Sequence, residues 1–440
     1  MTYQELKTEE QQYVMNTYGR FPVALDHGEG ATLWDVEGKQ YIDLASGIGV
    51  NSLGYNNPVV VDAITAQAHK LAHTSNLYLT GPMVKVAKTL VTATGMGKVF
   101  FANSGAEANE GAIKLARKYS FDKYGEGRSK IVTLLNSFHG RTVTTLKATG
   151  QARFHNFFFP FTEGFDYAEA DNLDSVKEKA DSTACAVMIE LIQGEGGVLP
   201  LDPGFVKAVE AFCRERDLLL IVDEVQTGIG RTGSLFCFQD YGIRPDVVTM
   251  AKGLGGGVPV GAVLAGKSCC DVLTPGTHAT TFGGTPLVCA AADAVLSVVN
   301  DPEFLASVRE KGSYLRERIL GLGSPDIEGV RGAGLMLGII VSPEKRAGIV
   351  NGLLEKGVLV LTAGVDVQAD RFEVEVVGWG VGKESWGIRY QKIIGDTMEN
   401  PVWENLDAFL LTPFHKKDGT ALYISAACID SGYRSNQVYS

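Results

Sequence analysis

The chain has 440 residues, and its 45% hydrophobic and 21% charged residues exclude a disordered or fibrous protein. Its 40 Lys and Arg against 51 Asp and Glu give a formal net charge of −11, which disfavours nucleic acid or anionic membranes as general partners, although it does not exclude a local basic groove. The seven cysteines show no C-x-x-C spacing and the polar N-terminus lacks the apolar segment of a signal peptide, so we expect a reducing, cytoplasmic environment and no membrane span.

Along the chain, the apolar pattern predicts an α/β protein. A short N-terminal helix precedes a hairpin over residues 30–47 with its turn at Glu37-Gly38, and apolar residues recur at helical spacing from 58 to 94. Short apolar runs then alternate with helical stretches, which predicts a parallel sheet covered by helices on both faces. These runs span residues 98–102, 130–135, 185–190, 218–225, 247–252 and 261–266.

A smaller unit follows, and the composition then changes near residue 364. A helical stretch at 290–321 and strands at 330–341 and 357–361 predict the smaller unit. Residues 365–440 hold three of the four tryptophans, and there the alternation of strands with helices stops. The pattern in 370–380 and 384–396 predicts antiparallel strands instead. We expect a domain boundary within 361–364.

Two charged residues follow buried strands. Asp223, next to Glu224, ends the 218–225 run, where ligands of open α/β sheets bind, and a carboxylate there is costly to bury unless it is paired. A helix-capping or metal-binding role is the plain alternative. Lys252 ends another apolar run and precedes five glycines within ten residues, so partial desolvation would lower its pKa and free the amine to form a Schiff base. A solvated lysine at a strand end is the alternative there.

Two further segments have the chemistry of a ligand site. Residues 103–106 open a helix directly after a strand, which suits phosphate, although Ser104 as a simple N-cap explains the same pattern. Phe138 and Arg141 lie just past another strand, where a ring can stack on a planar ligand and a guanidinium can bind a carboxylate. His139 between them is expected to hydrogen-bond locally.

Together these features predict a pyridoxal phosphate site rather than a nucleotide site. In this interpretation the aspartate keeps the pyridine nitrogen protonated and the lysine binds the aldehyde. The glycine pattern at 228–233 matches a dinucleotide fingerprint, but no helical pattern follows it, and no P-loop motif occurs.

Residues 1 to about 363 resemble the class III aminotransferases of fold type I. The motifs NSGAEANEGAIK, FHGRT, ELIQGEGG, IVDEVQTGIGRTG, MAKGLGGGVPVGA and TFGG occur in the family's order and spacing, with Leu191 where relatives usually have Pro. The resemblance implies a large domain with a mostly parallel seven-stranded sheet, an incomplete small α+β domain, and pyridoxal 5′-phosphate as cofactor. It implies transfer of an amino group between N-acetylornithine and 2-oxoglutarate, with 4-aminobutyrate, ornithine or succinylornithine as alternative donors.

By the same resemblance, Lys252 and Asp223 would be catalytic and the enzyme a homodimer with shared sites. Arg141 would bind a substrate carboxylate, Glu195 would gate a second arginine, and Thr280 would lie near the substrate. The implied cofactor-binding residues are Ser104, Gly105, Ala106, Phe138, Glu190, Asp223, Val225, Gln226, Lys252 and, from the neighbouring subunit, Thr281. The implied domains are 1–50 and 286–363 for the small domain and 51–285 for the large one.

The C-terminal residues depart from this family. The arginine that grips the α-carboxylate of glutamate would follow residue 364, but no such stretch occurs there, so we expect a weaker reaction with glutamate unless Arg389 or another residue of this C-terminal segment replaces it. Residues 362–440 instead resemble the start of a phage terminase nuclease domain, which implies an RNase H-like fragment (364–440) with Asp366 and Asp430 as metal ligands. Ordinary strand-end acids are the alternative reading. A gene fusion or an assembly artefact would explain the junction.

Overall fold

The computed structural model describes residues 1–361, 371–379, 385–394, 414–415 and 421–422, with side chains for residues 1–361. The chain divides into two compact units. The first comprises Met1–Gln151 and Pro160–Gly364, and the second Ala152–Phe159 and Val365–Ser440.

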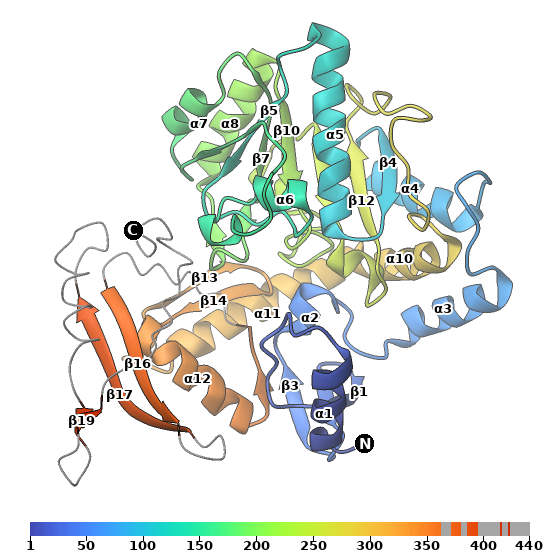
Figure 1. The fold of residues 1–440 in the computed structure, drawn as a ribbon. Helices are drawn as coiled ribbons and strands as arrows, with labels where there is room; N and C mark the ends of the chain where they lie inside the picture. The colour runs from blue at the N-terminus through green and yellow to red at the C-terminus, as the bar shows by residue number, and fades with distance from the viewer. Residues whose placement is uncertain (362–370, 380–384, 395–413, 416–420, 423–440) are drawn as a thin grey trace. The chain divides into compact units, whose positions relative to one another are not determined.

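A seven-stranded sheet forms the centre of the first unit (Figure 1). Its spatial order is β4 (Lys98–Ala102), β12 (Gly261–Ala265), β11 (Val247–Met250), β10 (Leu219–Asp223), β7 (Ala184–Ile189), β5 (Lys130–Leu134) and β6 (Phe165–Ala168). The predicted apolar runs all form strands of this sheet, whereas β6 was not predicted. The sheet is mixed, because β12 runs antiparallel to both neighbours. Our prediction of a parallel strand at 261–266 is therefore wrong. The link between Met250 and Gly261 is shorter than the roughly dozen residues of a parallel crossover.

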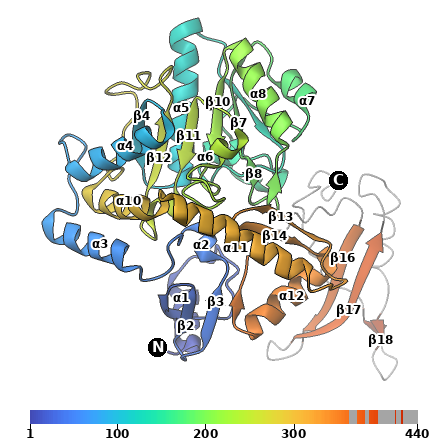
Figure 2. The same ribbon diagram turned by 180° about the vertical axis from the view of Figure 1, so that it is seen from behind.

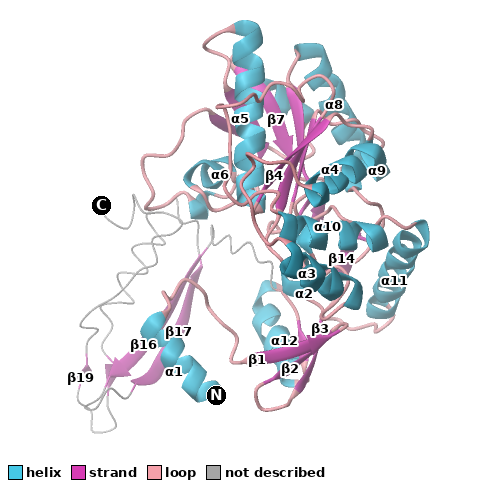
Figure 3. Ribbon diagram, turned by 90° about the vertical axis from the view of Figure 1, so that its right-hand side faces the viewer, coloured by secondary structure: helices cyan, strands magenta, loops and turns pink. Residues whose placement is uncertain are grey.

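Helices cover both faces of this sheet, as predicted. Along β10, Leu219 and Ile221 pack into one apolar cluster with α5 (Gly105–Tyr124), while Leu220 and Val222 pack into another. The second cluster includes residues of α4 (Gly81–Thr94), α8 (Pro203–Arg216) and α10 (Pro286–Val299). Figure 3 shows α5 on one side of the sheet and α4 and α8 on the other.

A smaller four-stranded sheet lies in the same unit (Figure 2). Its order is β1 (Leu25–Glu29), β2 (Thr32–Asp35), β3 (Gln40–Asp43) and β15 (Val358–Leu359). The antiparallel β2–β3 pair confirms the predicted hairpin, and Gly38 in its turn has a φ of 83°, which glycine adopts without strain. Residues 330–341 form a second hairpin, β13 (Gly329–Ala333) and β14 (Met336–Ile340), which turns at Gly334.

The long helical stretches predicted from the sequence are each split in two. Residues 58–94 form α3 (Pro58–Lys70) and α4, and residues 290–321 form the end of α10 and α11 (Pro302–Leu320). At the second break, the Asp301 side chain accepts hydrogen bonds from the N–H groups of Glu303 and Phe304, and Pro302 has no N–H to continue α10. The other helices of this unit are α1 (Tyr3–Tyr13), α2 (Ser46–Gly49), α6 (Val143–Ala148), α7 (Leu173–Lys179), α9 (Cys237–Tyr241), the 3-10 turn η2 (Lys252–Gly255) and α12 (Pro343–Glu355).

The second unit contains the antiparallel pair β16 (Arg371–Trp379) and β17 (Ser385–Ile394), which confirms the strands predicted there. It also contains the 3-10 turn η1 (Ala152–Phe154) and the short pair β18 (Phe414–His415) and β19 (Ala421–Leu422). Asp366 and Asp430, and with them the predicted RNase H-like fold, lie outside the described residues. Within the described part, no cluster of His, Cys, Asp or Glu could hold a metal, and no helix is long and apolar enough to cross a membrane.

Candidate active site

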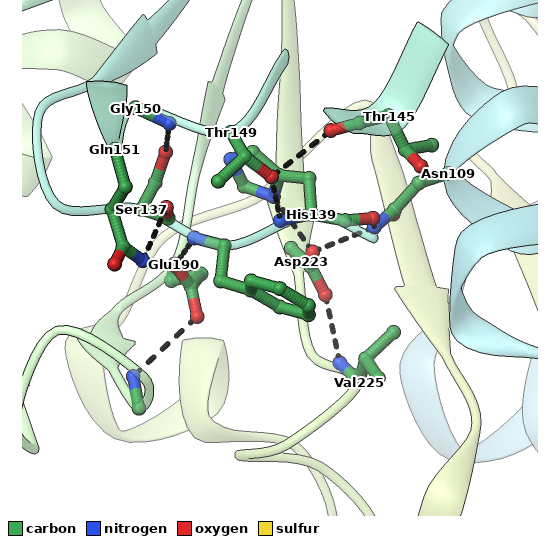
Figure 4. A network of polar contacts seen from close by, with 12 residues as sticks. Asn109, Ser137, His139, Thr145, Thr149, Gly150, Gln151, Glu190, Asp223 and Val225 are labelled. Atoms are coloured by element: carbon green, nitrogen blue, oxygen red, sulfur yellow. Dashed lines mark hydrogen bonds and ion pairs between the residues drawn. The ribbon is translucent and has the colours of Figure 1, made fainter. Parts of the chain in front are cut away.

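Asp223 lies at the carboxyl end of β10 and is 4% exposed. Its Oδ2 accepts hydrogen bonds from Asn109 Nδ2 and His139 Nδ1, each at 2.8 Å, and its Oδ1 accepts one from the Val225 N–H at 3.0 Å. Figure 4 shows these groups converging on the carboxylate. The three bonds compensate the cost of burying a charge and hold the side chain in one orientation.

The expectation that His139 hydrogen-bonds only locally is wrong. Its backbone N–H does donate to nearby Thr149, but its ring pairs with Asp223, which lies 84 residues further along the chain. Burial acts to lower the pKa of His139, and the bond to Asp223 with its charge raises it by more. The ring therefore favours the protonated form, and its buried Nε2 has no partner among the described residues.

Asn109 is a site residue that the sequence analysis missed. It belongs to α5 and is 1% exposed, and its amide also donates to the carbonyl oxygen of His139 at 2.7 Å. A signal was present in the sequence, since Asn109 lies among small apolar residues on the buried face of the helix. A polar side chain in such a place needs a partner.

Lys252 follows β11 and opens the turn η2. Its φ of 41° lies in the left-handed region, which is strained for a residue with a side chain and is found most often at functional sites. Burial lowers the pKa of the Lys252 amine, while the charges of Glu195 and Asp223 oppose this effect. A lowered pKa raises the fraction of neutral amine, which is the nucleophilic form.

The start of α5 has the backbone geometry that suits an anion. Ser104 is the N-cap, and its Oγ accepts the Glu107 N–H at 3.2 Å, which leaves other N–H groups of the first turn available. Gly105 is packed closely, since a Cβ at this position would lie 2.7 Å from Val225 Cγ1. Asn103, just before the cap, donates to Thr280 Oγ1 at 3.2 Å. Thr280 therefore lies beside this helix end, whereas the next residue, Thr281, is exposed.

The segment after β5 lies beside the loop that follows β7. The Phe138 N–H donates to Glu190 Oε2 at 2.8 Å, and the Arg141 guanidinium lies 5.5 Å from the centre of the Phe138 ring. Burial raises the pKa of Glu190 to about 7. Gly194 of the same loop approaches Gln226 so closely that a Cβ there would overlap the Gln226 amide.

These groups fit pyridoxal phosphate. A helix N-terminus suits its phosphate, a half-buried lysine suits its aldehyde, and a buried carboxylate suits its ring nitrogen. The charges of three predicted residues, Asp223, Glu190 and Glu195, act on the Lys252 amine, and so does the charge of Arg231. Arg231 was not predicted.

The sequence matches the family described as "Aminotransferase class-III" over residues 13–372. It is 50% identical to the acetylornithine aminotransferase of Haemophilus ducreyi over 365 residues. The aligned region covers 82% of this chain and 92% of that protein. It is 44% identical to the succinylornithine transaminase of Citrobacter koseri, over 81% of this chain and 89% of that protein. The ornithine aminotransferase from Toxoplasma gondii superposes with a TM-score of 0.79 at 34% identity, covering 82% of this chain and 88% of that one.

A second family matches the C-terminal part. Residues 342–440 match the family described as "Terminase large subunit gpA, endonuclease domain". The two matches overlap over residues 342–372, which include α12 and β15.

Proposed function

The chain belongs to the class III aminotransferases, which are pyridoxal phosphate-dependent transaminases of fold type I, and from this premise we propose that it transfers an amino group from N-acetylornithine to 2-oxoglutarate. The observation that carries the proposal is Lys252, strained and half-buried, with the charge of the buried Asp223 acting on its amine. The 50% identity to an acetylornithine aminotransferase supports the choice of donor.

The residues around Lys252 have distinct proposed roles. When bound, pyridoxal phosphate supplies the aldehyde and the electron-accepting ring. Lys252 would bind the aldehyde and move the proton, Asp223 would pair with the ring nitrogen, and Phe138 would stack on the ring. The residues proposed to complete the cofactor site are Ser104, Gly105 and Ala106 at the phosphate, and Glu190, Val225 and Gln226 around the ring.

The substrate side uses the loops at the edge of the site. Arg141, beside Phe138, binds the carboxylate that is distant from the reacting amine, as a guanidinium fork suits. Glu195 lies in the loop after β7, and its charge acts on the Lys252 amine. Thr280 lies by the start of α5 and near the substrate.

The enzyme is proposed to act as a homodimer in which Thr281 reaches the neighbouring site. The segment before α4, the first turn of α4 and the loop around Thr281 expose a group of large apolar side chains, as expected of an interface. They are Leu71, Leu77, Tyr78, Leu79, Val84 and Phe282. Asn76 links the two segments by donating to the Gly283 carbonyl oxygen at 2.9 Å. Sedimentation should show a dimer that Leu79→Asp weakens, and a monomeric wild type would refute the proposal.

The first experiment tests cofactor and donor together. Borohydride reduction and peptide mapping should place the cofactor on Lys252, and a label on another lysine would contradict the site. The reduced cofactor should be absent from Lys252→Ala. Of acetylornithine, succinylornithine, ornithine and 4-aminobutyrate, acetylornithine should show the highest kcat/KM with 2-oxoglutarate. If one of the other amines is preferred, the transaminase activity stands and only the proposed donor is wrong.

We further propose that the small domain, residues 1–50 and 286–363, is incomplete and that residues 364–440 form a separate nuclease-like segment. The described residues form an apolar groove of about 480 Å³ beside β15. Its lining includes Leu33, Val350, Leu354, Val358 and Leu361. Apolar surface left open at this place is what we expect if a packing segment of the aminotransferase has been replaced.

A further inference from the structure

Arg231 lies in the loop after β10, and its guanidinium faces the turn that contains α2. Its Nη2 is 3.5 Å from both Ser46 Oγ and Ser52 Oγ, at the outer limit of hydrogen-bond distance. Its Nε is buried and has no partner among the described residues. An arginine with an unpaired buried Nε and only two long contacts at Nη2 has hydrogen-bonding capacity left for a ligand.

The nearest acid does not neutralise this guanidinium by direct contact. The charge of Asp43 acts on Arg231, but the two do not form an ion pair among those found in the described part of the chain. Asp43 Oδ1 accepts the N–H groups of Ala45 and Ser46, and its Oδ2 accepts the Tyr55 hydroxyl at 2.7 Å. The carboxylate is therefore already occupied by its own loop.

Arg231 lies on the side of the reacting amine. Ser52 packs against Gly253, where a Cβ would lie 2.7 Å from Ser52 Oγ, and Gly253 directly follows Lys252. The charge of Arg231 also acts on the Lys252 amine. By contrast, Arg331 Nε is engaged with the Gly197 carbonyl oxygen at 2.8 Å.

The turn that faces Arg231 is strained. Ser46, Gly47, Ile48 and Gly49 have φ values of 54°, 62°, 63° and 76°, all in the left-handed region. This region is unfavourable for Ser46 and more so for the β-branched Ile48. Such strain persists where the surrounding structure requires it, most often next to ligands. Here it places the Ser46 hydroxyl beside the guanidinium.

We propose that Arg231 binds the carboxylate attached to the carbon that reacts, which is the α-carboxylate of glutamate and 2-oxoglutarate. This assignment rests on the proposed function, because acetylornithine has no carboxylate next to its reacting amine and glutamate does. Arg141 then binds the distant carboxylate of either substrate. In this proposal, the reaction with glutamate depends on Arg231 and not on an arginine after residue 364.

Binding of two unreactive probes to the cofactor-loaded protein tests this by calorimetry. Glutarate carries carboxylates at both ends, whereas N-acetyl-L-norvaline has only the distant one. Arg231→Gln should weaken glutarate binding about 10- to 100-fold, as expected for loss of charge-assisted hydrogen bonds, and change N-acetyl-L-norvaline binding less than about twofold. Arg231→Lys should lie between wild type and Arg231→Gln, because it keeps the charge and loses the fork.

Two matched arginine variants control the result. Arg128 Nε and Nη2 already donate to the carbonyl oxygens of Ala184, Arg216 and Asp217, so Arg128→Gln should leave the ratio of the two affinities unchanged. Arg141→Gln should weaken both probes. If thermal melting shows that Arg231→Gln does not fold, the test uses Arg231→Lys, which should weaken binding of glutarate more than binding of N-acetyl-L-norvaline.

Unchanged glutarate binding in a folded Arg231 variant, or equal loss of both probes, would overturn the assignment. A wild type that binds neither probe overturns it as well. Glutarate binding that depends on Arg231 in a protein that transaminates no amine would support the carboxylate site and refute the proposed function instead.

Discussion

At the scale of single residues, the site depends on burying charge together with its partners. Asp223 has three hydrogen-bond donors, one of them a histidine whose pKa is raised by the pairing. The neighbouring Glu224 is equally buried but has only neutral donors, the Thr227 hydroxyl at 2.5 Å and the Phe238 N–H at 2.7 Å. Two adjacent acids therefore have different electrostatic surroundings, and we expect different consequences when each is neutralised.

Asp223→Asn should leave the cofactor bound and slow transamination by roughly 10²–10³-fold, because a neutral amide cannot provide the charge that pairs with the ring nitrogen. Stopped-flow absorbance in a single turnover measures this rate. Glu224→Gln is the matched control, since it neutralises the adjacent buried acid and should change the rate far less. Equal rates in wild type and Asp223→Asn would contradict the role of Asp223.

Glu224 should make stability depend on pH. Burial raises its pKa from 4.5 to about 7 in the folded protein. Between these values the unfolded chain releases a proton that the folded protein keeps, so stability falls as pH rises from about 4.5 to 7. Glu224→Gln cannot titrate and so removes this loss. The free energy of unfolding of the variant minus that of wild type should therefore rise by up to about 3 kcal/mol between pH 4.5 and 7. Urea unfolding of both proteins at pH 4.5, 6 and 7.5 measures this difference. The prediction is refuted if the free energies of unfolding of variant and wild type change with pH in parallel.

At the scale of elements, the site forms where strand ends meet the start of α5. β10 ends at Asp223, β11 is followed by Lys252, and α5 begins with Gly105 after β4. β4 and β11 both pair with β12, so the antiparallel strand brings the start of α5 next to the loop that carries the lysine. We therefore expect the cofactor's affinity to depend on how closely these elements fit.

Gly105→Ala tests that fit. Its Cβ would lie 2.7 Å from Val225 Cγ1, and the stiff valine, which is proposed to pack on the ring, would have to move. We expect a loss of about 1–3 kcal/mol in stability and a weaker affinity for pyridoxal phosphate, measured by fluorescence titration. Gly348→Ala in α12, where a Cβ meets nothing within 4 Å, is the control and should be neutral or stabilising. Unchanged cofactor affinity in Gly105→Ala would contradict the proposed position of the cofactor at the start of α5.

At the scale of the whole molecule, the chain combines matches to two families. The aminotransferase match ends at residue 372, and the nuclease match begins at residue 342. The large sheet and its two apolar clusters lie before this overlap, and so do the residues of the proposed cofactor site. The small sheet does extend into it, through β15.

The two half-reactions should therefore differ. In the proposed site, Arg141 binds the carboxylate of acetylornithine, whereas glutamate needs a second arginine. By the family resemblance, that arginine would lie in the segment that residues after 364 replace. Mixing the cofactor-loaded protein with each donor in a stopped-flow spectrometer should show a faster change in cofactor absorbance with acetylornithine. Equal efficiency with glutamate would mean that Arg231 or a C-terminal residue fully compensates for the replaced segment.

The C-terminal segment should have no useful nuclease activity. Two predicted metal ligands, Asp366 and Asp430, do not suffice to hold two divalent ions without further acids. Duplex DNA incubated with the protein and Mg²⁺ or Mn²⁺ should stay intact. Cleavage that Asp366→Ala abolishes would make the protein bifunctional and overturn this prediction.

The sequence alone determined the apolar runs that became strands, the break of the chain's pattern near residue 364, and Lys252 and Asp223 at strand ends, because these are local patterns. Only the tertiary structure decided that β12 runs antiparallel, that His139 pairs with a residue 84 positions away, and that Arg231 faces the Ser46–Gly49 turn. Burial and pairing energies depend on which distant segments meet, and no local pattern contains that information. His139 shows this most clearly, because its neighbours in sequence indicate a local bond and the fold supplies a stronger partner.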